Sequence, residues 1–273
     1  MIDRNLPPSH HLIKNMHNLP QKLLSQFIYL LSALVGLIAF FYPFFLPQIQ
    51  TPEFQAMRGG EAPLLTVILL ILCLAVMVLE VQGEAVSAKM VATLGVLVAV
   101  TSILRFIEVA IPAPGGFSPI FAPIILAGFV FGGRFGFLMG VMTLLTSALI
   151  TGTVGPWLPY QMFTAGWVGL TAGWIPKFKD LRISFLFLLI FGFGWGLLYG
   201  ALMNLYFWPF VAGDPANSWE TGLSLRAGLA RYSAFYLLTS LVWDLARSVG
   251  NVLLLLALGM PAIRALTRFK NRF

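Results

Sequence analysis

The sequence has very few charged residues. Only 10% of its 273 residues are Asp, Glu, Lys or Arg, whereas 59% are hydrophobic. About a quarter of the residues in a soluble domain are charged, so this composition excludes an ordinary soluble protein. The net charge of +7 does not indicate a nucleic-acid binder either, because the basic residues separate apolar segments instead of gathering on one face. We therefore expect the chain to lie in a membrane.

Side chains that commonly bind metals or act as nucleophiles are also scarce. Cys73 is the only cysteine, and His10, His11 and His17 all lie in the polar N-terminal leader. A lone cysteine excludes a disulfide framework and a cysteine metal cluster. Since the histidines have no carboxylates or cysteines beside them, we interpret the leader as a solvated tail, and we expect no metal and no cofactor.

Three motifs of hydrolytic enzymes are missing. The sequence contains no G-x-x-x-x-G-K-[ST], no H-E-x-x-H and no G-x-S-x-G. Without the phosphate-binding loop, the chain is not expected to use ATP itself. A metal-dependent or serine-type membrane hydrolase also loses most of its support.

The sequence is rich in apolar segments that are long enough to cross a bilayer. About 20 apolar residues cross it as a helix, because every backbone polar group must be satisfied internally there. We therefore predict an all-α integral membrane protein with about eight spans, near residues 23–46, 63–82, 88–111, 119–133, 135–152, 160–176, 183–208 and 230–258. The fourth to sixth spans are short and rich in Gly and Pro, and the last is long.

Basic residues predict the orientation of the spans. They lie before the first span, at the start of the third, between the fourth and fifth, after the sixth and after the last (Arg4, Lys14, Lys22, Lys89, Arg134, "KFKDLR", "RALTRFKNRF"). With eight spans these positions share one side, and Lys and Arg collect in cytoplasmic loops. We thus expect a multi-pass cell-membrane protein with both termini in the cytoplasm.

The composition changes near residue 84, beyond which glycine and aromatic residues become more frequent. This change divides the chain into residues 1–84, a tail with two added transmembrane helices, and residues 85–273, a body of six helices. No internal repeat or low-complexity tract is present.

The third predicted span has a stripe of small residues. Ala88, Ala92, Gly95, Ala99 and Ser102 follow offsets of four and three, which place them within about 80° of one another on a helix. Small residues let helices approach closely in a membrane. The stripe predicts a docking face, either for another helix of the same chain or for a second protein.

Small residues recur at four-residue spacing in four later spans. They are Gly128, Gly132, Gly136 and Gly140, then Ala165, Gly169 and Gly173, then Gly192, Gly196 and Gly200. For these positions we favour close helix packing over ligand contact.

Charged residues also lie inside two predicted spans. Arg105 and Glu108 lie near the outer end of the third span, and Asp244, Arg247 and Asn251 share one face of the last span. Charges at bilayer depth are costly, so they usually pair and mark a pathway or site. A structural ion-pair network and a ligand site remain open, and a ligand pocket favours the shallower pair, Arg105 and Glu108.

The predicted outer loops are aromatic and almost free of Lys and Arg. They include "IPAPGGFSP", "TGTVGPWLPYQMF" and "FWPFVAGDPANSWETG". Trp157, Tyr160, Gln161 and Asn204 in or beside them could stack on and hydrogen-bond a ligand. An interfacial aromatic belt is the alternative, but the placing of Trp157 between two prolines favours a rigid wall around a ligand.

Taken in order, residues 86–266 resemble the substrate-specific S components of energy-coupling factor (ECF) vitamin transporters. The resemblance is carried by the small-residue stripe and by four segments: "RFIEVAIPAPGGFSPIFAPIILAGFVFGGRFGFLMG", "GPWLPYQMFTAGWVGLTAGW", "LYGALMNLYFWPF" and "RSVGNVLLLLALGMPAIRAL". The two N-terminal spans are a departure from the family pattern.

The resemblance implies a six-helix subunit that captures a vitamin from outside, with a transmembrane coupling protein and two cytoplasmic ATPases as partners. It implies docking of the coupling protein on Ala88, Ala92, Gly95 and Ala99. By position it implies that the ligand site, beside Arg105 and Glu108, includes Gly115, Gly116, Ser118, Trp157, Tyr160, Gln161 and Asn204. Among the family's vitamins, cobalamin is the specific expectation, and thiamine, riboflavin, biotin or a precursor remain open.

Two other classes of function remain open from the sequence. An integral membrane enzyme could act on a lipid or isoprenoid, with Glu108 or Asp244 as its acid-base group. A structural membrane scaffold would bind no small ligand at all.

Overall fold

The fold is known from a computed structural model. It describes residues 88–111, 116–211, 214–220 and 222–272, together with isolated residues of the N-terminal part: Leu34, Gly36, Leu37, Ile38, Phe40, Phe41, Phe44 and Ile71. Apart from these isolated residues, the predicted spans 23–46 and 63–82 lie outside the described residues, and the domain boundary near residue 84 stays a prediction.

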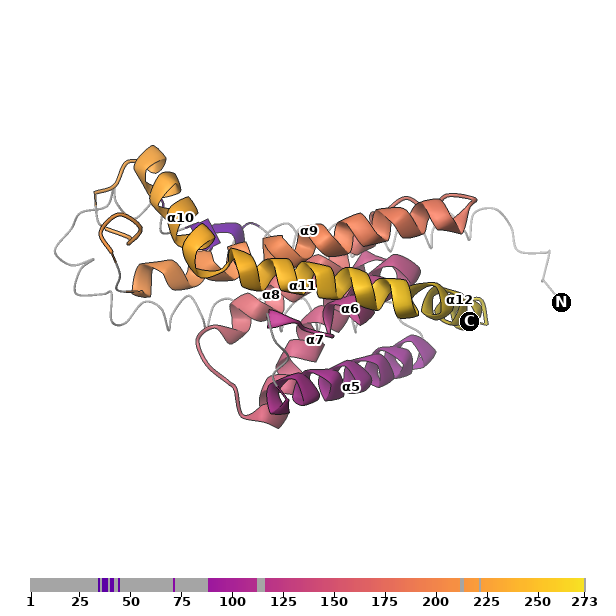
Figure 1. The fold of residues 1–273 in the computed structure, drawn as a ribbon. Helices are drawn as coiled ribbons and strands as arrows, with labels where there is room; N and C mark the ends of the chain where they lie inside the picture. Colours follow the sequence, from indigo (N-terminus) through magenta and orange to yellow (C-terminus); the bar gives the residue numbers. More distant parts are fainter. Residues whose placement is uncertain are drawn as a thin grey trace, which may run out of the picture.

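The described body consists of helices and connecting turns (Figure 1). The helices are α5 (Ala88–Ala110), α6 (Phe121–Phe131), α7 (Gly133–Thr151), α8 (Leu158–Ala172), α9 (Leu181–Phe207), η3 (Trp208–Phe210), α10 (Leu225–Thr239), α11 (Leu241–Leu254), η4 (Leu255–Gly259) and α12 (Met260–Lys270). Among the described residues, four helices are long and apolar enough to span a membrane: α5, α7, α9 and the continuous helix Leu241–Lys270. The all-α membrane fold is thus confirmed.

The last predicted span, 230–258, is wrong in both of its bounds. Helix α10 ends at Thr239, and the next helix runs from Leu241 through a π-helical turn to Lys270. The Thr239 hydroxyl group donates to the Phe235 carbonyl oxygen at 2.7 Å, a local bond of the kind that bends or ends helices. Pro261 has no N–H to donate in the first turn of α12, and the wider π-helical turn before it accommodates that loss.

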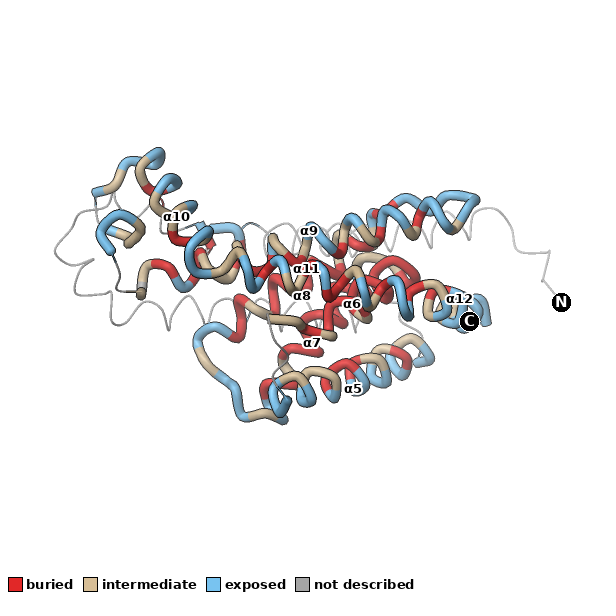
Figure 2. The backbone as a smooth tube through the Cα atoms, in the orientation of Figure 1, coloured by how far each residue is buried: buried red, intermediate tan, exposed pale blue. Residues whose placement is uncertain are grey.

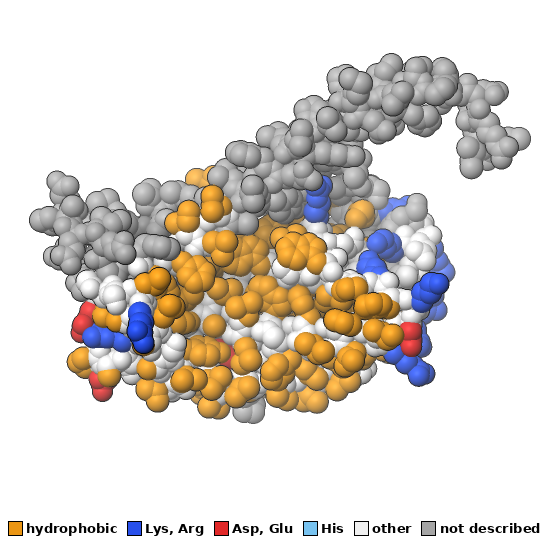
Figure 3. All heavy atoms as spheres, turned by 90° about the horizontal axis from the view of Figure 1, so that it is seen from above, with side chains coloured by type: hydrophobic (Ala, Val, Ile, Leu, Met, Phe, Trp, Pro, Cys, Tyr) orange, Lys and Arg blue, Asp and Glu red, His pale blue; other side chains and the backbone are white. Residues whose placement is uncertain are grey.

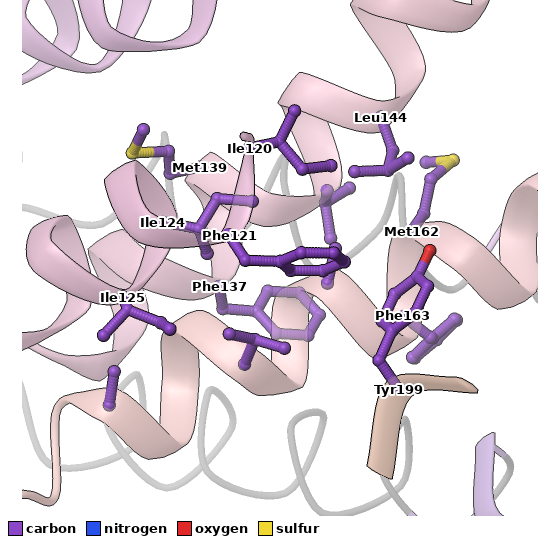
Figure 4. Packing of buried hydrophobic residues seen from close by; sticks show 14 of the residues in the cluster. Ile120, Phe121, Ile124, Ile125, Phe137, Met139, Leu144, Met162, Phe163 and Tyr199 are labelled. Carbon is purple, nitrogen blue, oxygen red and sulfur yellow. The ribbon is translucent and has the colours of Figure 1, made fainter. Parts of the chain in front are cut away.

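Helices α6, α7 and α8 form the buried centre of the body, where glycine allows backbones to touch (Figure 2). A Cβ atom on Gly136 of α7 would overlap the carbonyl oxygen of Gly169 on α8, and one on Gly140 would overlap that of Ala165. Around these contacts pack fully buried side chains such as Ile124, Met139 and Phe163 (Figure 4). The packing role predicted for the glycines of α7 and α8 is confirmed.

Helices α9 and α11 meet in the same way along the other side of the body. Gly192 faces Leu255, Gly196 faces Ser248 and Gly200 faces Asp244, and in each case an added Cβ atom would overlap the facing residue. The small-residue stripe of α9 is therefore a packing surface, as predicted.

Gly132 does not share this packing role, so the prediction for it is wrong. Its φ is +108°, and a Cβ atom there would have no neighbour within 4 Å. Gly132 forms the turn between α6 and α7, and residues with a side chain rarely adopt its positive φ.

The two ends of the body differ in charge. Figure 3 shows hydrophobic side chains across the middle of the molecule and most Lys and Arg side chains at one end. That end, called the basic end below, carries α12 and the α8–α9 connection, with Lys177, Lys179, Arg264, Arg268 and Lys270. The opposite end carries the connections around residues 116–118, 152–157 and 208–224.

We expect Gly136→Ala to destabilise the protein, because its methyl group would push α7 away from α8. Overpacking of this kind costs about 1–3 kcal/mol. Gly194→Ala on α9 is the matched control, since a Cβ atom there meets nothing within 4 Å. Thermal unfolding of both variants in one detergent measures the difference, and equal melting temperatures would contradict the close packing of α7 on α8.

Candidate ligand-binding site

An ion pair lies near the end of α5 that faces away from the basic end. Arg105 Nη1 donates to Glu108 Oε1 at 3.0 Å, and the side chains are 23% and 17% exposed. A spacing of three residues places both on one helix face. The second carboxylate oxygen, Glu108 Oε2, accepts a hydrogen bond of 2.7 Å from the buried Ser118 hydroxyl group.

The segment of residues 116–118 joins this pair to α11. Gly116 has a φ of +65°, and a Cβ atom on it would lie 3.2 Å from the Trp243 carbonyl oxygen and 3.6 Å from Arg247 Nη2. The ring of Phe117 lies directly against Gly250. Residues 116–118 therefore lie between α5 and α11, while Gly115 falls outside the described residues.

A second ion pair lies in the first turns of α11. Arg247 Nη1 pairs with Asp244 Oδ1, and the Asp244 side chain is only 3% exposed. The guanidinium carbon of Arg247 lies 5.5 Å from the ring centroid of Tyr199, and its Nη1 is 3.5 Å from the Gly196 carbonyl oxygen. Because Asp244, Tyr199 and the α9 backbone all hold it, Arg247 has a fixed position.

Tyr199 shows that the two ion pairs face a common region. Its buried ring packs edge-on against Phe121 at a centroid distance of 4.6 Å and lies under the Arg247 guanidinium group. Gly116 lies beside the same guanidinium group, and Ser118 donates to Glu108 of the first pair. We call Arg105, Glu108, Gly116, Ser118, Asp244 and Arg247 the two-pair cluster. The sequence predicts four of these, Arg105, Glu108, Gly116 and Ser118, as ligand-site residues. It does not predict that Arg247 lies beside Gly116, because no pattern gives the distance between the third span and the last.

Asn251 is separate from the two-pair cluster. Its Nδ2 donates to the Gly192 carbonyl oxygen at 3.0 Å, so it fastens α11 to α9 about two turns below Asp244. Within the described part of the chain, no hydrogen bond joins Asn251 to the second ion pair.

Tyr160 lies in an aromatic cluster rather than at an open surface. Its ring is 1% exposed, with centroids 5.1 Å from Phe40 and 4.1 Å from Tyr206. Phe44 of the N-terminal part packs similarly on Trp208, at 5.8 Å. The sequence alone did not show that two N-terminal phenylalanines cover these rings.

Trp157, Gln161 and Asn204 are more exposed than Tyr160. The Trp157 ring lies against Gly155, where a Cβ atom would overlap it, and the residue is 42% exposed. Gln161 and Asn204 are half-buried. No side-chain hydrogen bond or ion pair in the described ranges connects these three residues to the two-pair cluster.

The small-residue stripe of α5 is divided between two surroundings. Ala88, Ala92, Gly95 and Ala99 are exposed, and a Cβ atom on Gly95 would meet nothing within 4 Å. Ser102 is buried, with its hydroxyl group 3.4 Å from the Thr143 carbonyl oxygen of α7. Four of the five residues thus form an open face, and the fifth belongs to the α5–α7 contact.

At the basic end, two lysines cover the C-terminal turn of α6. Lys270 Nζ donates to the Val130 carbonyl oxygen at 2.7 Å, and Lys177 Nζ lies 5.5 Å from the Phe129 ring centroid. Burial lowers the pKa of Lys177, and the positive charge of Lys270 lowers it further. Cations suit a helix C-terminus, so these contacts explain the two lysines as structural.

One comparison with known proteins identifies a family. A sequence-family model described as the substrate-specific component of ECF transporters matches residues 89–259, which is more than half of the chain. No curated protein and no solved structure matches the chain.

We expect Asp244→Asn to destabilise the protein strongly, because the half-buried Arg247 would lose its counter-charge. Breaking a buried pair from one side costs about 3–5 kcal/mol. The double variant Asp244→Asn with Arg247→Gln should recover most of that loss, since no unpaired charge remains. Glu220→Gln is the control, because it breaks the more exposed Arg231–Glu220 pair at 2.9 Å and should cost under about 1 kcal/mol. Equal losses of melting temperature in the two single variants would refute a buried, structural role for Asp244.

Proposed function

Because the chain belongs to the family of substrate-specific components of ECF transporters, we propose that it captures a vitamin or related micronutrient outside the cell. The family membership makes it the substrate-binding subunit of an ECF importer, and not an enzyme. The observation that supports our proposal is the two-pair cluster, in which α5 and α11 bring together four charges, one buried and three half-buried. Charges placed this way in a membrane protein usually mark a site.

The chain is a multi-pass membrane protein, and we propose that its basic end faces the cytoplasm. Lys and Arg collect on the cytoplasmic side of membrane proteins, and the basic end carries most of those described here. The two-pair cluster then lies in the outer half, where a ligand arrives. With eight spans, both termini are cytoplasmic.

The proposed ligand site combines the two-pair cluster with the neighbouring loops. Its polar contacts come from Arg105, Glu108, Gly116 and Ser118. We include Gly115 in the site because it precedes Gly116 in the sequence. Trp157, Gln161 and Asn204 contribute from the 152–161 segment and the end of α9. Tyr160 acts indirectly: its ring is buried between Phe40 and Tyr206, where it supports the neighbouring segment of Trp157 instead of contacting the ligand. Cobalamin is our first candidate ligand.

The proposed partners are a transmembrane coupling protein and two cytoplasmic ATPases, which supply the energy that this chain cannot. The open face of α5 is the proposed docking surface. Ala88, Ala92, Gly95 and Ala99 are exposed there and carry no large side chain. Since lipid provides no hydrophobic driving force for helices to associate, the affinity between α5 and the coupling protein comes mainly from close backbone approach across small residues. Docking at this face would then release the ligand inward.

We expect Ala92→Trp to abolish vitamin uptake while leaving ligand binding intact, because the indole would hold the coupling protein away from α5. Uptake by cells that express the chain with its coupling module measures the first effect, and ligand affinity of the purified chain measures the second. Ile190→Trp on α9 is the control, since Ile190 is 63% exposed and lies on another helix. Normal uptake with Ala92→Trp would show that this face is not the docking surface.

We expect Trp157→Ala to weaken ligand binding about tenfold, which corresponds to about 1.4 kcal/mol, because it removes one aromatic wall. Trp174→Ala is the matched control, since Trp174 is exposed at the basic end. Titration with cyanocobalamin, followed by riboflavin, biotin and thiamine, gives the affinities. An affinity that both substitutions leave unchanged would assign Trp157 to the aromatic belt at the membrane surface.

A further inference from the structure

We propose that the two-pair cluster binds a ligand head group that has no net charge and presents more than one acceptor atom in one plane, as an imide does with its two carbonyl oxygens. This inference rests on the proposed function and adds the substrate class. It also adds Arg247 of α11 to the residues that contact the ligand.

The positive and negative charges of the two-pair cluster balance. Arg105 and Arg247 carry two positive charges, and Glu108 and Asp244 carry two negative charges, each paired within its own helix. An additional charge in a half-buried site would have no partner, and an unpaired charge is costly at low dielectric. A ligand without net charge avoids this penalty.

The two guanidinium groups have more hydrogen-bond donors than the acceptors they contact. A guanidinium group has five N–H donors in a flat fork. Among the described residues, Arg105 and Arg247 together find three acceptors: Glu108 Oε1, Asp244 Oδ1 and the Gly196 carbonyl oxygen. Glu108 Oε2 accepts from Ser118, and Asp244 Oδ2 is a buried acceptor without a hydrogen-bond partner among the described residues. The two guanidinium groups still have more donors than these oxygens can accept, and water or a ligand must supply the other acceptors.

The guanidinium groups are held in position but remain partly exposed. The side chains of Arg105 and Arg247 are 23% and 17% exposed. Asp244 and the face of Tyr199 hold Arg247 in place, and the segment of Gly116 lies directly beside it. Donors held in position before binding lose little entropy when the ligand arrives, which favours a tight site.

A flat acceptor edge suits this arrangement better than a single acceptor atom. Guanidinium groups bind planar groups through two parallel hydrogen bonds, whereas a lysine ammonium acts as a point charge. Arg247→Lys would therefore keep the charge balance but lose the paired hydrogen bonds.

The test uses the purified full-length chain in detergent and probes of known charge. Cyanocobalamin and riboflavin are neutral overall and carry amide or imide carbonyl groups, thiamine is a cation, and biotin is a carboxylate whose amide is neutral. We expect at least one neutral probe to bind in calorimetric titration and to raise the melting temperature. Thiamine should not bind, and biotin should bind no more tightly than its amide.

Variants of the two arginines test which residues make the contact. Arg105→Gln and Arg247→Gln should each weaken the neutral probe on the order of tenfold to a hundredfold, the value of a hydrogen bond to a charged donor. Arg247→Lys should lose affinity while keeping the wild-type melting temperature of the ligand-free chain. Arg231→Gln removes an arginine of the surface pair with Glu220 and should bind as the wild type does. If Arg247→Gln folds poorly, the double variant with Asp244→Asn replaces it.

Three results would overturn the inference: binding of thiamine or ionised biotin in preference to the neutral probes, binding of a neutral probe that no arginine substitution weakens, or no binding of any neutral probe.

The proposed function fails separately. It fails if the chain neither co-purifies with a coupling protein nor supports uptake of any vitamin. A chain that imports thiamine through such a complex would refute the neutral head group and retain the transporter.

Discussion

Gly200 places the backbone of α9 directly against the carboxylate of Asp244, and the position of Arg247 depends on that contact. A side chain at residue 200 would overlap the Asp244 carboxylate, so the carboxylate could not lie where it does. Asp244 in turn holds the Arg247 guanidinium, which lies over Tyr199 and beside Gly116. A residue without a side chain therefore determines where a charged group can be held inside an apolar body.

The same principle organises the rest of the bundle. Lipid tails are as apolar as leucine, so helices in a membrane gain little from hiding apolar side chains from one another and associate through close packing. In this chain the close contacts occur where Gly136 meets Gly169 and where Gly196 meets Ser248. The apolar side chains that do not take part, such as Ile103, Ile190 and Val242, remain exposed on the outside of α5, α9 and α11, as expected for surfaces in lipid.

Much of this arrangement can be predicted from local sequence, and the exceptions have two physical causes. Hydropathy and four-residue spacing depend on neighbours along the chain, so the helices from α5 to α9, the boundary between α6 and α7 near Arg134 and the packing role of Gly200 were predictable. The break at Ser240 depends on local hydrogen bonds inside an apolar stretch, which hydropathy cannot register. The burial of Tyr160 and the approach of Arg247 to Gly116 depend on contacts between distant segments. No periodicity in a single sequence carries that information.

The described residues of the N-terminal part also bear on how such a chain would meet a partner. Phe40 packs on Tyr160 and Trp167, and Phe44 packs on Trp208 and Tyr232. These contacts lie on α8, η3 and α10, whereas the open face around Gly95 belongs to α5. The contacts of Phe40 and Phe44 therefore do not involve the small-residue face of α5. The added N-terminal residues that are described here are therefore compatible with docking at α5, and their contact with Tyr160 connects them to the proposed ligand wall instead.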